Sequence, residues 1–254
     1  MIAPVICTIA ALLLPVQAPR AQADTIFIEV GSPQLDASFF KPHAARVRIY
    51  NGQGVQTAEW DNELTLGDSA GRRVMRWITT GRPVASNPGR PLQRLFQTFD
   101  LVTLAPLGYV ASSNTGVYVQ LKIDGKKVTG IRRPGPTAPV QDVNVELDAP
   151  GFMMGASDLV PVAAGLKTGT VLVAPLWAPN MTSSERRVFV VLADTTVMVE
   201  GKPQRARKVD ERKRGDKSLV ASWYLLMDDP YMVYGEVPLS DGTVQRMTEV
   251  PIPR

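Results

Sequence analysis

The chain has 254 residues, of which 44% are apolar and 20% are charged, and its formal net charge is +4. This composition is that of a folded globular protein and excludes a disordered chain. The small charge excess argues against a nucleic-acid-binding protein, because such proteins concentrate Lys and Arg on one face. With one cysteine, Cys7, and one histidine, His43, a zinc site of the usual ligands is disfavoured, and we expect neither a metal nor a cofactor.

The N-terminal segment has the features of an export signal. Residues Ile2 to Val16 are almost wholly apolar, and the following Ala21-x-Ala23 is the small-residue pattern that signal peptidase requires. We therefore predict a signal peptide over residues 1–23, cleaved near Ala23, and a periplasmic or secreted protein. The alternative is a retained membrane anchor, but the apolar run is shorter than the roughly 18–20 residues of a spanning helix. Because Cys7 would leave with the leader, the mature chain would have no thiol.

The next part of the chain is predicted to be a loose segment followed by strands and turns. Residues 24–43 show no periodic pattern, whereas Val47 and Ile49 alternate with polar residues, which is typical of a half-buried strand. Asn51-Gly52-Gln53-Gly54 predicts a hairpin turn, because Asn and Gly tolerate a positive φ. The Pro/Gly-rich stretch from Gly81 to Pro91 predicts a loop.

The middle of the chain contains the clearest alternation, from Val117 to Ile123. Asp124-Gly125 then predicts a tight hairpin. The proline-rich loop 132–139 is where two domains could divide, but we predict a single β domain over residues 44–254. One short helix is expected, capped by Ser157 or Asp158 and ending at Gly165.

From Thr170 onward, apolar strands separated by short turns follow one another. They are expected at Val171–Val173, Val188–Leu192, Val197–Val199, Arg205–Val209, Leu219–Leu226, Tyr231–Val237 and Val244–Val250. Strands at this spacing pair antiparallel, since parallel neighbours need long crossovers. The predicted fold is therefore mainly β: a strongly curved antiparallel sheet or open half-barrel meander with one short helix.

Three segments resemble a family of exported bacterial proteins that carry a domain of unknown function. They are Phe99-Asp100-x-x-Thr103-Leu104-x-Pro106, then Val119 to Ile123 with Asp124-Gly125-Lys126-Lys127-Val128-x-Gly130, and Trp223-Tyr224 followed by an acidic turn and Tyr231-Met232-Val233. The resemblance covers about residues 94–250. It implies a sheet curled around a helix with an apolar concave face, similar to periplasmic lipoprotein carriers and receptors. It carries over no catalytic residue.

Two groups of residues are candidates for binding. Several C-terminal strands are apolar on both faces, so one face could cover an apolar ligand such as a lipid. The ligand-binding candidates are Val188, Val190, Leu192, Leu219, Trp223, Leu225, Tyr231 and Val233. A basic cluster could meet an anionic envelope surface, or it could be a solvated edge that prevents aggregation. Its members are Arg205, Arg207, Arg212, Lys213 and Arg214.

The function expected from these features is non-catalytic binding or envelope assembly in the periplasm, with a lipid or lipoprotein as partner. No Gly-x-Ser-x-Gly elbow accompanies His43, so we interpret this histidine as a solvated loop residue. The alternative is a carboxylate-dependent hydrolase or lyase acting on cell-wall carbohydrate. Its candidates are Asp61 and Glu63 beside Trp60, and Asp228-Asp229, and it requires two carboxyl groups across a cleft. The sequence does not indicate an oligomeric state.

Overall fold

The computed structural model describes residues 25–226 and 231–252. Within them the helical elements are α1 (Leu159–Ala163) and two 3-10 turns, η1 (Ala37–Phe39) and η2 (Met154–Ala156). The strands are β1 (Thr25–Phe27), β2 (His43–Tyr50), β3 (Gln56–Ser69), β4 (Arg72–Arg82), β5 (Gln93–Asp100), β6 (Pro106–Ser113), β7 (Tyr118–Asp124), β8 (Lys127–Arg133), β9 (Gln141–Glu146), β10 (Phe152–Met153), β11 (Val171–Trp177), β12 (Glu185–Val199), β13 (Lys202–Lys213), β14 (Leu219–Leu226), β15 (Met232–Pro238) and β16 (Val244–Pro251). The predicted signal peptide and the acidic residues Asp228 and Asp229 lie outside the described residues.

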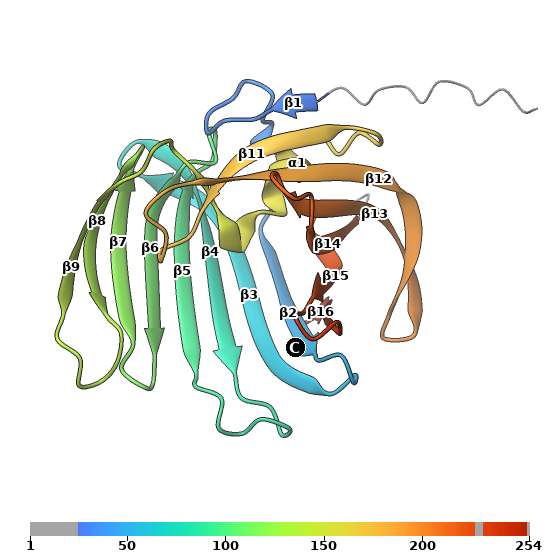
Figure 1. Ribbon diagram of the computed structural model, residues 1–254, viewed down its shortest axis with the longest axis horizontal. Coiled ribbons are helices and arrows are strands. Elements are labelled where there is room, and N and C mark those ends of the chain that lie inside the picture. The colour runs from blue at the N-terminus through green and yellow to red at the C-terminus, as the bar shows by residue number, and fades with distance from the viewer. Residues whose placement is uncertain (1–24, 227–230, 253–254) are drawn as a thin grey trace, which may run out of the picture.

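These strands form a single sheet of 16 strands in the described part of the chain. Its order is β1-β11-β12-β13-β14-β15-β16-β2-β3-β4-β5-β6-β7-β8-β9, with β10 beside β11. Every neighbouring pair from β11 to β9 is antiparallel. The sheet curls strongly without closing into a barrel, and α1 lies inside the curve (Figure 1). The predicted curved antiparallel sheet with one short helix is confirmed.

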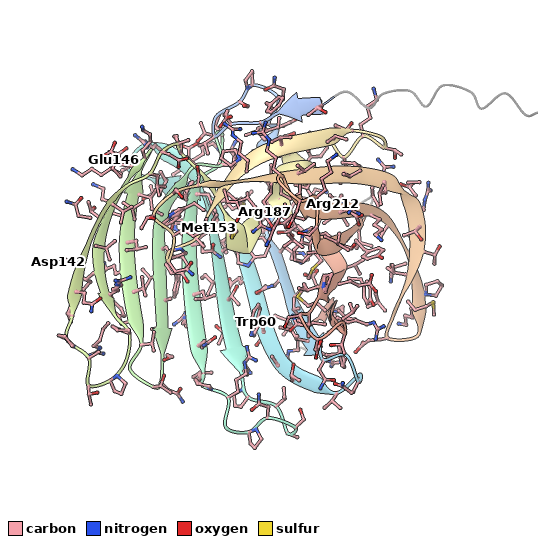
Figure 2. All side chains as sticks on the ribbon, viewed as in Figure 1. Trp60, Asp142, Glu146, Met153, Arg187 and Arg212 are labelled. Carbon is pink, nitrogen blue, oxygen red and sulfur yellow. The ribbon has the colours of Figure 1, made fainter. Side chains whose placement is uncertain are left out.

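Two short strands depart from that prediction, because β1 and β10 pair with β11 in parallel. β1 lies within residues 24–43, which we had expected to be loose. β1 has three residues and β10 has two. Strands this short show no periodic pattern in the sequence, so neither was predicted. The opposite edge of the sheet is β9, and Asp142 and Glu146 lie along it (Figure 2).

The inner face of the sheet carries one set of alternating residues. On β4 and β5 this set includes Met75 and Phe99, which are paired across the two strands and are buried. On β11 it includes Leu172 and Leu176, which are also buried. Met153 lies inside the curve between these two walls (Figure 2). The main apolar core is therefore the space enclosed by the curved sheet.

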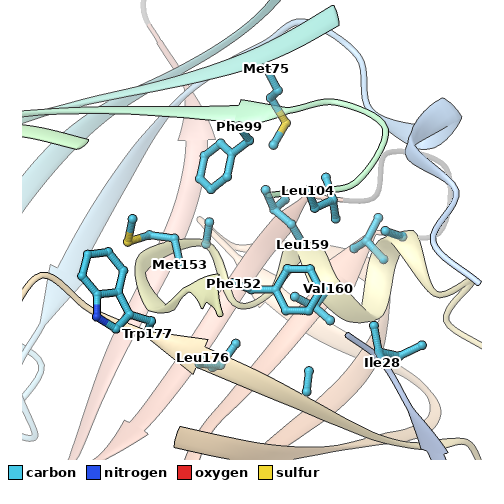
Figure 3. Close-up of a cluster of buried hydrophobic side chains, with 14 of the residues drawn as sticks. Ile28, Met75, Phe99, Leu104, Phe152, Met153, Leu159, Val160, Leu176 and Trp177 are labelled. Carbon is cyan, nitrogen blue, oxygen red and sulfur yellow. The ribbon is translucent and has the colours of Figure 1, made fainter. Parts of the chain in front are cut away.

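Helix α1 fills this space at one end of the sheet. Its Leu159 and Val160 lie between Met75 and Phe99 on one side and Leu176 on the other (Figure 3). The helix ends at Ala163, and Gly165, with a φ of +89°, follows its C-cap residue Ala164. The N–H of Gly165 donates to Val162 O and the N–H of Leu166 donates to Pro161 O, which is the Schellman ending that glycine favours.

The hairpin of β12 and β13 bends away from the main core along its length. The pairing register shifts between Val191 and Asp194, and such a bulge turns the strand. Before the shift, Phe189 and Val191 are buried in the main core. Beyond the shift, the half of the hairpin that contains the turn packs on the outer face of β14, β15 and β16. This second cluster contains Val197, Val199, Ala206, Tyr224, Val233 and Val250.

Candidate functional site

A cavity of about 480 Å³ lies where the tip of the β12–β13 hairpin meets the ends of β14, β15, β16 and β2. Val199, Val233 and Val250 belong both to its lining and to the second apolar cluster. The complete lining is His43, Ala44, Ala45, Val199, Glu200, Lys202, Gln204, Leu226, Val233, Glu249, Val250 and Pro251. A mostly apolar wall with a few polar groups is the usual composition of a small-molecule pocket.

The hairpin is held over this cavity by two kinds of contact. Apolar side chains of the second cluster pack beneath it, and Arg48 of β2 forms an ion pair with Glu200 at its tip. Glu200 has a positive φ of 47°, and Gly201 follows with 77°. The tip is therefore a tight turn that places Glu200 and Lys202 at the rim of the cavity.

His43 and Glu249 border the cavity, but their side chains lie on the inner face of the sheet. Glu249 pairs with Val47 and therefore points to the opposite face from Val250. His43 begins β2, and its Nε2 lies 2.8 Å from Oε1 of Glu249 on the neighbouring strand β16. The ring of Tyr231 stacks on the imidazole at a centroid distance of 4.2 Å. Tyr231 is itself fixed by the backbone of Lys41, whose N–H donates to its hydroxyl oxygen at 2.9 Å. His43 is therefore an anchored part of the sheet, and its interpretation as a solvated loop residue was wrong.

A second polar group lies deeper, beneath the N-terminus of α1. Glu211 of β13 is only 3% exposed, and burial raises the pKa of its carboxyl group. Ser157 Oγ and Trp223 Nε1 each donate to its Oε2 at 3.0 Å, and Arg187 Nη1 donates to Oε1 at 3.4 Å. These bonds connect the segment before α1 to β12, β13 and β14 (Figure 2 labels Arg187).

Asp158 lies beside this group at the N-cap of α1, where it makes no side-chain capping bond. Burial raises the pKa of its carboxyl group to about 7, and the negative charges of Glu249 and Glu211 contribute in the same direction. Glu249 and the carboxyl groups beneath α1 thus influence one another electrostatically on the inner side of the sheet.

The eight ligand-binding candidates fall in different places. Val233 lines the cavity, and Tyr231 is buried against His43. Trp223 and Leu225 pack against the main core. Leu219 is half-buried at the start of β14. Val188, Val190 and Leu192 are also half-buried on β12, where Val188 and Val190 lie on the outer face, opposite to Phe189. Ligand binding at these residues stays a prediction.

The basic cluster is spread along β13 rather than gathered at one tip. Arg205 and Arg207 both form ion pairs with Asp194, at 2.7 and 2.6 Å. At the other end of the strand, Arg212 is 2.6 Å from Asp210, and Lys213 and Arg214 lead into the turn to β14. The two ends of this cluster therefore belong to different surfaces.

The carboxylates proposed for sugar chemistry do not share a cleft with Trp60. Asp61 and Trp60 are consecutive residues of β3, so they point to opposite faces of the sheet. Asp61 lies on the outer face, 2.7 Å from Arg46 Nε and 2.8 Å from Arg82 Nη2. Asp228 and Asp229 are outside the described residues. Among the residues that the structure describes, no group of three or more His, Cys, Asp or Glu side chains could hold a metal ion.

The sequence itself matches no protein-family model and no curated protein. Among solved structures, a β-barrel-like protein of the domain of unknown function DUF1849 from Brucella abortus is 12% identical, with a TM-score of 0.46 over 83% of this chain and 96% of that chain. A Bacteroides fragilis protein described as exported, with a YmcC-like fold, is 7% identical, with a TM-score of 0.36 over 83% and 95%. A Parabacteroides distasonis protein described as a lipoprotein is 8% identical, with a TM-score of 0.35 over 85% and 98%.

The first of these proteins is described by a domain of unknown function and the second as exported, which are the two features of the family that the sequence resembles. Along the described ranges, no helix has the length and apolar character needed to cross a membrane.

Proposed function

We propose that this protein is a non-catalytic binding protein of the bacterial envelope that holds a lipid or another apolar ligand in the cavity beneath the β12–β13 hairpin. The observation that carries the proposal is the cavity itself. Its volume of about 480 Å³ lies within the usual range of ligand pockets. Its apolar side would take the ligand's hydrocarbon part, and Lys202 and Gln204 of β13 would face its polar end.

The chemistry of the lining favours binding over catalysis. The described residues that line the cavity include no serine, threonine, tyrosine or cysteine, so among them there is no hydroxyl or thiol nucleophile. His43 is engaged by Glu249 and by the ring of Tyr231. Both contacts hold the imidazole on the inner face of the sheet, away from the apolar side of the cavity.

A fluorescent probe tests the proposal directly. N-phenyl-1-naphthylamine becomes bright in apolar pockets, and the Ala44→Trp substitution would place a bulky ring at the exposed mouth of the cavity. We expect the substitution to weaken probe binding about tenfold or more, because the ring occupies space that the probe needs.

The matched control is Val140→Trp, which adds the same ring at a residue that is 57% exposed and away from the cavity. This variant should bind the probe as the unchanged protein does, and thermal unfolding should show that both variants are folded. Equal probe binding by a folded Ala44→Trp variant would refute the proposed site.

A further inference from the structure

The outer face of the sheet carries a row of directly paired residues across β1, β11, β12 and β13. Phe27 pairs with Val173, Val173 with Val188, and Val188 with Arg212. In the next row, Val171 pairs with Val190. The apolar part of this surface therefore comes from three strands, and its basic part begins on the fourth.

The exposed apolar group of this surface is Phe27, with 53% of its area accessible. Val188 and Val190 beside it are half-buried. The guanidinium of Arg214 lies 5.7 Å from the centre of the Phe27 ring, at a distance typical of cation–π contacts. The turn between β13 and β14 thus folds toward β1, and an aromatic ring and a cation share one exposed surface.

Cations outnumber acids in the turn between β13 and β14, and the groove that this turn borders also carries Asp148 and Glu185. Arg186 is paired with Glu29 at 2.7 Å, and Arg212 with Asp210 at 2.6 Å. Lys213 and Arg214 are exposed, and within the described residues no carboxylate lies in ion-pair distance of either. Lys217 is a further exposed cation of the same turn, and Asp216 is the acid of this turn, whose carboxyl pKa is lowered by hydrogen bonds from Ser218 and by the charge of Lys213. The cations exceed the acids at this turn.

We propose that this surface, the Phe27 patch (Phe27, Val188, Val190, Arg212, Lys213 and Arg214), docks on the anionic surface of a phospholipid bilayer. An exposed aromatic ring enters the interface between headgroups and acyl chains, and neighbouring Lys and Arg attract anionic headgroups. The long side chains of Arg212 and Arg214 can lie along apolar surface while their charged ends reach the phosphates. The inference is independent of the ligand cavity, because the two sites share no residue.

Vesicle flotation with two matched pairs of variants tests the patch. The vesicles contain equal parts of phosphatidylglycerol and phosphatidylcholine. The Lys213→Gln/Arg214→Gln variant should lose about 10- to 30-fold in partitioning, because each cation near an anionic surface contributes roughly fivefold. The control is Lys126→Gln/Lys127→Gln, which removes the same charge from the exposed turn between β7 and β8 and should bind nearly as the unchanged protein does.

The apolar part of the patch is tested by Phe27→Ser, with Met198→Ser as control because Met198 is 58% exposed at the far end of β12. Only Phe27→Ser should reduce partitioning, and neither variant should change probe binding in the cavity. Failure of the unchanged protein to float with anionic vesicles would overturn the proposal. Equal losses in a patch variant and its control would also overturn it, because binding would then depend on overall charge or apolarity.

Discussion

At the scale of single residues, Asp158 makes stability depend on pH. Its carboxyl pKa is raised to about 7 by burial, above the ordinary value of 3.8. Between these two values the folded protein holds a proton that the unfolded chain releases, so this contribution to the free energy of unfolding falls as pH rises from about 4 to 7. Asp158→Asn should therefore be more stable than the unchanged protein at pH 8, by about 2 kcal/mol because the side chain is partly accessible.

Urea unfolding at pH 5 and pH 8 measures this difference. Asp148→Asn is the matched control, because hydrogen bonds from Ser184 lower the pKa of Asp148. That variant should lose stability at pH 8, the opposite direction. If Asp158 has a raised pKa, the free energy of unfolding of Asp158→Asn is offset from that of the unchanged protein by different amounts at pH 5 and pH 8; an equal offset would show that it has none.

Glu211 is the residue that joins the helix segment to the sheet. Glu211→Leu would leave the Ser157 hydroxyl without its acceptor and would remove the buried partner of Arg187, which keeps its ion pair with the more exposed Glu185 at 2.9 Å. Breaking a buried pair in this way costs about 3–5 kcal/mol. Combining it with Arg187→Met should recover part of that loss in denaturant unfolding. Additive losses in the double variant would show that the two side chains do not stabilise each other.

At the scale of elements, α1 owes its place to apolar packing rather than to helix propensity, since it has five residues and short helices are unstable alone. Leu159→Ala should cost about 2–5 kcal/mol of unfolding free energy, because the side chain is buried in the main core. The control Val102→Ala, at a residue 67% exposed, should change stability by less than about 0.5 kcal/mol. Similar small effects for both variants in urea unfolding would contradict the packing of α1.

The alternation of apolar and polar residues predicted most strands. This alternation is visible within the sequence of each strand, and it shows which face of the strand is apolar. Val119 and Leu121 illustrate this, since both pack in the main core. The bend in β12 could not be predicted in that way. The run from Val188 to Ala193 is apolar throughout, and its division between an inner and an outer face depends on a bulge and on partners far along the chain.

At the scale of the whole molecule, the candidate site depends on one contact between distant parts of the sequence. β16 pairs with β2, and this places Glu249 beside His43 although 206 residues separate them. No local pattern carries that information, so the sequence predicted an apolar surface on the C-terminal strands but not the cavity. Of the predicted ligand residues, Val233 alone belongs to its lining.

The most direct test of the account is native mass spectrometry of the protein released from cells without detergent. We expect an added mass on the unchanged protein, which organic solvent extracts as a lipid or another apolar molecule, and its loss in the folded Ala44→Trp variant. An unchanged protein that carries only the mass of its polypeptide, or a variant that keeps the added mass, would contradict it.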